Sequence, residues 1–63
     1  MKFIKLYRPK SQSDIYLNVE NVVYMKDAGA GFSATKTMIY TTDKDVIGVS
    51  ESIDEIMEKM NNN

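Results

Sequence analysis

A glycine-rich segment at residues 29–34, Gly-Ala-Gly-Phe-Ser-Ala, matches one form of the dinucleotide-binding motif G-x-G-x-x-A. That motif holds a pyrophosphate only when a helix follows at once, because the first amides of the helix bind the phosphates. Residues 36–40 have the composition of a strand instead. A P-loop also fails, since Ala30 and Thr35 stand where that motif requires glycine. We therefore expect a flexible hairpin loop and no nucleotide.

Acidic residues near the end of the chain are the second candidate for chemistry, as a calcium-binding loop. Counted from Asp43, an EF-hand requires an oxygen ligand where Ile47 stands and a glutamate where Asp54 stands.

The chain has no histidine and no cysteine, so zinc sites and most nucleophilic or acid–base chemistry lack their usual side chains. We predict no catalytic residue, no metal, no cofactor, and a protein that is not an enzyme.

The segments that must position any functional surface have mainly the composition of β-strands. Runs of β-branched and aromatic residues, bounded by turn-forming residues, predict strands at 2–8, 15–17, 22–26, 35–42 and 46–49. Pro9 ends the first strand, and the polar residues 10–14 predict a hairpin connection. Residues 18–21 predict a turn or a short 3₁₀ segment, and residues 27–31 predict a surface loop.

The last segment changes to a helical period. Apolar side chains recur on one helix face at Ile53, Ile56, Met57 and Met60. Ser52 and Glu55 have the spacing of a capping box, which places the start of the helix. The pattern predicts a single small α+β domain over residues 1–63. We expect a small antiparallel sheet of four or five strands, or a partly open barrel, with one C-terminal helix.

Strand alternation gathers tyrosines and lysines on one side of the predicted sheet. We expect the side that faces the helix to hold Ile4, Leu6, Ile15, Leu17, Val23, Met25, Ile47 and Val49. In the fourth strand Ile39 and Tyr40 point opposite ways, and one of the two registers places Tyr40 on the outer face. The candidate binding face, which Phe3 adjoins, then consists of Lys5, Tyr7, Tyr16, Tyr24, Lys26, Lys36 and Tyr40.

Three interpretations suit such an outer face. It can pack against a protein partner, it can stack the bases of single-stranded nucleic acid, or its tyrosines can simply be good strand residues on a half-exposed sheet. The net charge of −1 offers no long-range attraction for phosphate, although residues 1–10 carry +4 and residues 43–63 carry −4. We expect a protein–protein interaction module, with nucleic-acid binding as the alternative.

The length of the chain favours self-association. A domain of 63 residues buries only about 60% of the surface that its unfolded chain exposes, and disulfides or a structural metal are the usual supplements that this composition lacks. We therefore expect a homo-oligomer and an unidentified protein partner.

Membrane helices need about 20 apolar residues in a row, and no such run and no signal-peptide core is present. We expect no membrane association and a cytoplasmic location.

Three segments carry a resemblance to a known family, namely residues 15–24 (IYLNVENVVY), 38–43 (MIYTTD) and 49–56 (VSESIDEI). Together they resemble the small flagellar-associated FlbD/SwrD-type proteins, in which similar strand, turn and helix-start patterns cover nearly the whole chain. The chain is also similar to short orphan proteins of phages and mobile elements, and more distantly to LytTR-type DNA-binding domains. The resemblance implies a sheet-plus-helix fold without catalytic residues, in a phage-accessory or flagellar-associated protein. This sequence departs from it by placing Lys44 where the family has a turn glycine, and by an insertion at residues 28–33.

Overall fold

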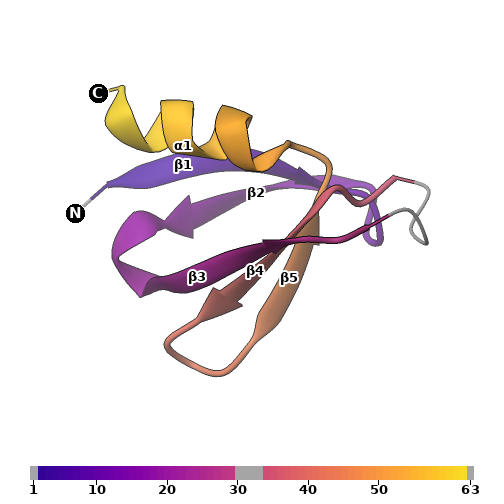
Figure 1. Cartoon of the computed structure of the whole chain (residues 1–63), viewed down its shortest axis with the longest axis horizontal. Helices are drawn as coiled ribbons and strands as arrows, with labels where there is room; N and C mark the ends of the chain where they lie inside the picture. The colour runs from indigo at the N-terminus through magenta and orange to yellow at the C-terminus, as the bar shows by residue number, and fades with distance from the viewer. Residues whose placement is uncertain (1, 30–33, 63) are drawn as a thin grey trace.

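Five strands and one α-helix make up the fold in the computed structural model, which describes residues 2–29 and 34–62 (Figure 1). The elements are β1 (Phe3–Arg8), β2 (Ser13–Asn18), the 3₁₀ turn η1 (Val19–Asn21), β3 (Val22–Asp27), β4 (Thr37–Thr41), β5 (Val46–Val49) and α1 (Ile53–Asn61). All strand pairs are antiparallel, so the predicted α+β class with a C-terminal helix is confirmed. The strands are divided between two sheets, β1–β2 and β3–β4–β5.

The 3₁₀ turn η1 carries the chain from the first sheet into the second. The Asn18 side chain caps η1 by accepting a hydrogen bond from the Glu20 N–H at 3.0 Å, as expected for an asparagine before a tight turn. The Asn21 carbonyl accepts the N–H of Thr42 at 2.8 Å, which ties η1 to the end of β4. The abrupt turn separates β2 from β3, and the two strands do not pair.

Both sheets and the helix contribute side chains to one hydrophobic core. Its buried members are Ile4, Leu6, Leu17, Ile39, Val49 and Ile56. In β4 the buried side of the strand also holds Thr37 and Thr41, whose hydroxyls donate to the carbonyls of Glu51 (2.8 Å) and Asp45 (3.4 Å). Because these hydroxyls are satisfied, threonine can occupy buried positions without the cost of an unpaired polar group.

The expectation that Val23 faces the core is wrong. The pairing of β3 with β4 shifts between Val22, opposite Thr41, and Tyr24, opposite Tyr40, so Val23 is the extra residue of a β-bulge. Val22 packs against the core in its place, and Val23 is 59% exposed. One extra residue breaks the alternation of inward and outward side chains at this point.

The turn between β4 and β5 holds Lys44 in the left-handed region, with φ at 66°. A side chain there costs roughly 1–2 kcal/mol, partly offset because glycine loses more freedom on folding. We expect Lys44→Gly to raise the free energy of unfolding by about 0.5–1 kcal/mol, measured by urea denaturation. Lys10→Gly is the matched control, because Lys10 lies in the other hairpin turn without a positive φ. Equal effects of the two substitutions would contradict this account.

The helix begins with the expected capping box. The Ser52 Oγ accepts the Glu55 N–H at 3.2 Å, and a Glu55 carboxylate oxygen accepts the Ser52 N–H at 2.9 Å. The hydrogen bond from the Ser52 backbone N–H, and after it the Ser52 side chain, hold the pKa of the Glu55 carboxyl below its ordinary value of 4.5, and the nearby charges of Lys36 and Lys59 lower it further. The folded protein therefore stabilises the ionised form of the Glu55 carboxyl over the protonated form.

This lowered pKa predicts a pH dependence of stability. A carboxyl with a lower pKa in the folded state than in the unfolded state stabilises above its unfolded value, and that contribution is lost as the pH falls through the folded value. We expect the melting temperature of the wild type to fall more steeply than that of Glu55→Gln between about pH 6 and pH 3. Parallel curves for the two proteins would show that the carboxylate contributes nothing to the cap.

Candidate functional site

The exposed face of the three-stranded sheet carries a stacked pair of tyrosines. Tyr24 of β3 and Tyr40 of β4 lie directly opposite each other, and their ring centroids are 4.3 Å apart with an interplanar angle of 11°. The buried threonines and Ile39 fix which side of β4 faces the core, and Tyr40 must then point outward. Tyr24 remains 51% exposed, so its ring presents an aromatic surface to solvent.

Apolar and basic side chains extend this surface along the same face. Val46 of β5 pairs with Tyr40 and is 46% exposed, and Lys26 pairs with Met38 one step along the face from the tyrosines. Cross-strand neighbours in such a sheet share one side. We call Tyr24, Lys26, Tyr40 and Val46 the aromatic patch.

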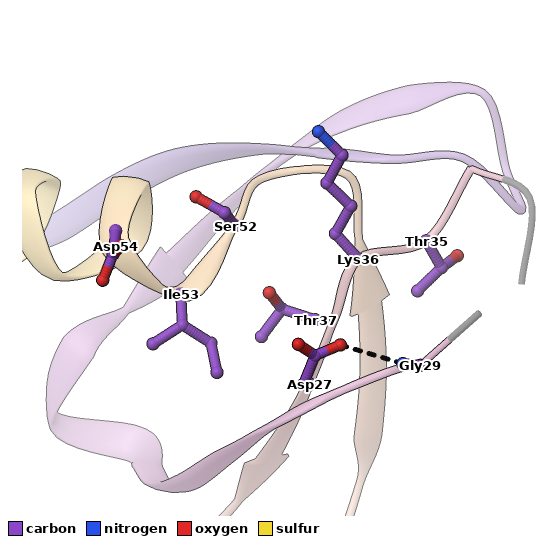
Figure 2. Close-up of a pocket in the computed structure, with 8 residues that line it drawn as sticks. All are labelled: Asp27, Gly29, Thr35, Lys36, Thr37, Ser52, Ile53 and Asp54. Atoms are coloured by element: carbon purple, nitrogen blue, oxygen red, sulfur yellow. Dashed lines mark hydrogen bonds between the residues drawn. The ribbon is translucent and has the colours of Figure 1, made fainter.

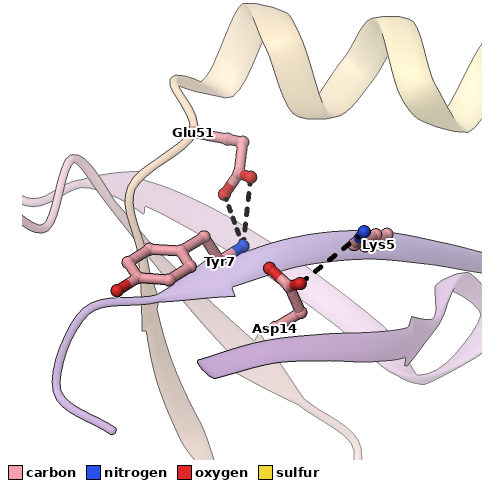
Figure 3. Close-up of polar contacts among 4 residues, drawn as sticks. All are labelled: Lys5, Tyr7, Asp14 and Glu51. Carbon is pink, nitrogen blue, oxygen red and sulfur yellow. Dashed lines mark hydrogen bonds and ion pairs between the residues drawn. The ribbon is translucent and has the colours of Figure 1, made fainter. Parts of the chain in front are cut away.

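Three of the remaining predicted residues lie on the other sheet. Lys5 lies opposite Tyr16, and Tyr7 lies opposite Asp14. The Lys5 ammonium is 3.6 Å from the Asp14 carboxylate (Figure 3), so its charge is partly balanced locally. Tyr16 is 69% exposed. The structure therefore distributes the expected outer face over two separate sheets.

The corner between the sheets is closed through Tyr7. Its carbonyl accepts the Ser50 N–H at 3.0 Å. Its N–H donates to both carboxylate oxygens of Glu51, at 3.1 and 3.0 Å (Figure 3). The Glu51 carboxylate thus replaces the backbone acceptor that a longer β5 would have provided. No sequence pattern marked Glu51 for this role, because its contact with Tyr7 spans most of the chain.

Lys36 lies apart from the tyrosines, at a shallow cleft between the start of β4 and the start of α1 (Figure 2). The cleft has a volume of about 610 Å³ and is lined by Asp27, Gly29, Thr35, Lys36, Thr37, Ser52, Ile53 and Asp54. One carboxylate oxygen of Asp27 accepts the Gly29 N–H at 2.9 Å, which forms a local turn. The hydroxyl of Thr37 is already bonded to the Glu51 carbonyl.

The glycine-rich segment is described only at its ends. Residues 30–33 lie outside the described part of the chain, and so does the centre of the G-x-G-x-x-A match. At the ends the Ala28 N–H donates to the Lys36 carbonyl at 2.9 Å. A strand, β4, follows the segment, where the dinucleotide motif requires a helix.

No protein-family model, curated protein or solved structure matches this chain. Within residues 2–29 and 34–62, no group of three acidic side chains is arranged to hold a metal ion. In the same residues, no helix has the length and apolar character needed to cross a membrane.

Sequence reasoning missed the exposed valines beside the tyrosines. Alternation predicts Val23 in the core, and it assigns no binding role to Val46. The doublet Val22-Val23 was a usable signal, because strict alternation allows only one of two adjacent valines to face inward.

Proposed function

We propose that this protein is a non-enzymatic interaction module of the phage-accessory or flagellar-associated kind, which binds another protein through the aromatic patch. The observation that carries the proposal is the exposed Tyr24–Tyr40 stack with Val46 beside it. Tyrosine supplies large contact area at low conformational cost, and protein interfaces are often centred on such residues. The stack also holds each ring in place before a partner arrives, which lowers the ordering cost of binding.

The chemistry of the patch suits a partner with an apolar or aromatic segment. Lys26 is its one charged member, next to the tyrosines on the same face. A lysine at the rim of an apolar patch suits a partner with a carboxylate beside its apolar anchor.

Single-stranded nucleic acid is the second candidate, favoured by the same lysine. A base can stack on the outward ring of Tyr24 while Lys26 meets a phosphate. The net charge of −1 and the single lysine in the patch make this candidate the weaker one, because affinity for nucleic acid comes mainly from neutralised phosphates.

The test is affinity capture with the full chain from cells that express it, comparing wild type with Tyr24→Ala and with Phe3→Ala as the matched control. We expect Tyr24→Ala to weaken partner binding by at least about 2 kcal/mol, as truncation of a central interface tyrosine does. Phe3→Ala changes a similarly exposed aromatic residue on the other sheet, 54% exposed against 51% for Tyr24, and should retain the partner. Loss through both variants, or through neither, would contradict binding by the aromatic patch.

A second measurement separates the two candidates. If the patch binds an oligonucleotide, affinity should fall steeply with salt and by about 1–3 kcal/mol in Tyr24→Ala. We expect no salt-sensitive binding of a mixed-sequence oligonucleotide by the wild type. Tight binding of this kind would reverse the order of the two candidates.

A further inference from the structure

The outer edge of β2 presents backbone groups that no other strand uses in the described part of the chain. The Val19 N–H donates to the Lys2 carbonyl at 3.0 Å, which sets the phase of the β1–β2 ladder. Hydrogen-bonded pairs alternate in an antiparallel ladder, so Leu17 and Ile15 also direct their backbone groups toward β1. The N–H groups of Asp14, Tyr16 and Asn18 therefore point away from β1, along the outer edge. The carbonyls of Asp14 and Tyr16 lie on that edge with them.

The second sheet has an outer edge at β3, but that edge is protected. The bulge at Val23 interrupts its ladder, and Lys26 adds a charge, both of which discourage a further strand from pairing. The β2 ladder runs through six consecutive pairs without a bulge, and the strand contains no proline and no lysine. Its one charged residue, Asp14, is paired with Lys5. The β2 edge is thus the edge that can accept another strand.

We infer that this edge pairs antiparallel with β2 of a second copy of the chain, across a two-fold axis at Tyr16. This inference goes beyond the proposed function and uses a different surface. In this register Tyr16 faces Tyr16 of the second copy, and the two exchange a reciprocal pair of hydrogen bonds. The Asn18 N–H of each chain then donates to the Asp14 carbonyl of the other. The result joins two β1–β2 hairpins into one continuous sheet.

Side-chain pairing selects this register over its neighbour. On the core side, Ile15 lies opposite Leu17 of the second copy, so apolar side chains meet in both directions. On the outer side, Asp14 lies opposite Asn18 of the second copy, and the two Asp14 carboxylates stay well apart. Shifting the second copy's strand by two residues would place Leu17 opposite Ser13. It would also bring the two Asp14 carboxylates to diagonal positions, where like charges repel. The proposed register is therefore more self-complementary than this neighbour.

The second copy also supplies what the first sheet lacks. A two-stranded hairpin is marginal by itself, and three or more strands are usual for independent stability. The hairpin is joined to the rest of the fold at the Tyr7 corner and through η1. Pairing with a copy covers the exposed edge and removes an aggregation liability.

Amide hydrogen exchange at two protein concentrations tests the inference residue by residue. The amides of Ile15 and Leu17 should be protected at both concentrations, because they bond to β1. The amides of Asp14, Tyr16 and Asn18 should slow by at least about tenfold when the concentration rises from micromolar to millimolar. Equal exchange of these three amides at both concentrations would overturn the inference, whatever the aromatic patch binds.

A charge-swap experiment tests the two-fold axis itself. Tyr16→Lys and Tyr16→Glu should each sediment as a 7.2 kDa species, because like charges meet across the axis. Mixed in equal amounts, they should form a heterodimer. Tyr24→Lys is the matched control on the other sheet and should associate as the wild type does. A dimer of either variant alone, or a folded mixture that stays monomeric, would overturn the proposed pairing, as would a wild type that stays monomeric at millimolar concentration.

Discussion

Replacing Ile56 with alanine is expected to lower the free energy of unfolding by about 2–5 kcal/mol, the usual cost of a large-to-small change in a core. Ile56 is 0% exposed and is the buried residue of α1, through which the helix enters a cluster shared by both sheets. A domain of this length has a total stability of only roughly 3–9 kcal/mol. The substitution should therefore bring the protein close to its unfolding midpoint in dilute buffer.

Urea denaturation followed by circular dichroism measures this effect, and Met57→Ala is its matched control. Met57 is the next residue of the same helix and is 46% exposed, so its truncation should cost well under half as much. If the two variants showed the same transition midpoint, Ile56 would not anchor the helix, and its place in the hydrophobic core would be wrong.

Replacing Glu51 with alanine should have the next largest effect on stability, a loss of about 1–2 kcal/mol in the free energy of unfolding. Hydrogen bonds to charged groups contribute about 1.5–3 kcal/mol, and partial exposure at this corner reduces that value. The substitution leaves the Tyr7 N–H without its acceptor. Glu51→Gln keeps one acceptor oxygen and should fall between the alanine variant and the wild type.

Exchange of the Tyr7 amide provides the local readout for Glu51. It should become faster in Glu51→Ala, while Glu58→Ala, an exposed glutamate of α1, should leave it unchanged. Global destabilisation without faster exchange at Tyr7 would show that Glu51 acts through some other contact than the corner between the sheets.

Local pattern accounts for the elements of this fold but not for how the strands are grouped. The helix start follows from Ser52 and Glu55, because a capping box involves only residues three apart. The division into two sheets depends on the turn η1 and on the contact between Tyr7 and Glu51, and the partners in this contact are 44 positions apart. Alternation alone cannot report such pairing.

The candidate site was predictable to a similar degree. Alternation places Tyr24 and Tyr40 on the outer side of their strands, and the structure brings the two rings together. It does not join them to Tyr7 and Tyr16, which belong to the other sheet, and Lys36 lies at the helix start instead. The binding roles of all seven residues remain predictions, because they depend on a partner.

The stack of Tyr24 on Tyr40 also gives the protein a built-in optical reporter. The chain has no tryptophan, four tyrosines and two phenylalanines, so its near-ultraviolet absorption and circular dichroism come mainly from tyrosine. Two aromatic rings fixed 4.3 Å apart form an asymmetric pair of chromophores, and near-ultraviolet dichroism is sensitive to such fixed packing. Any molecule that covers or separates these rings should change the spectrum of the unlabelled protein, so binding at the patch can be followed without a dye, a tag or an introduced residue.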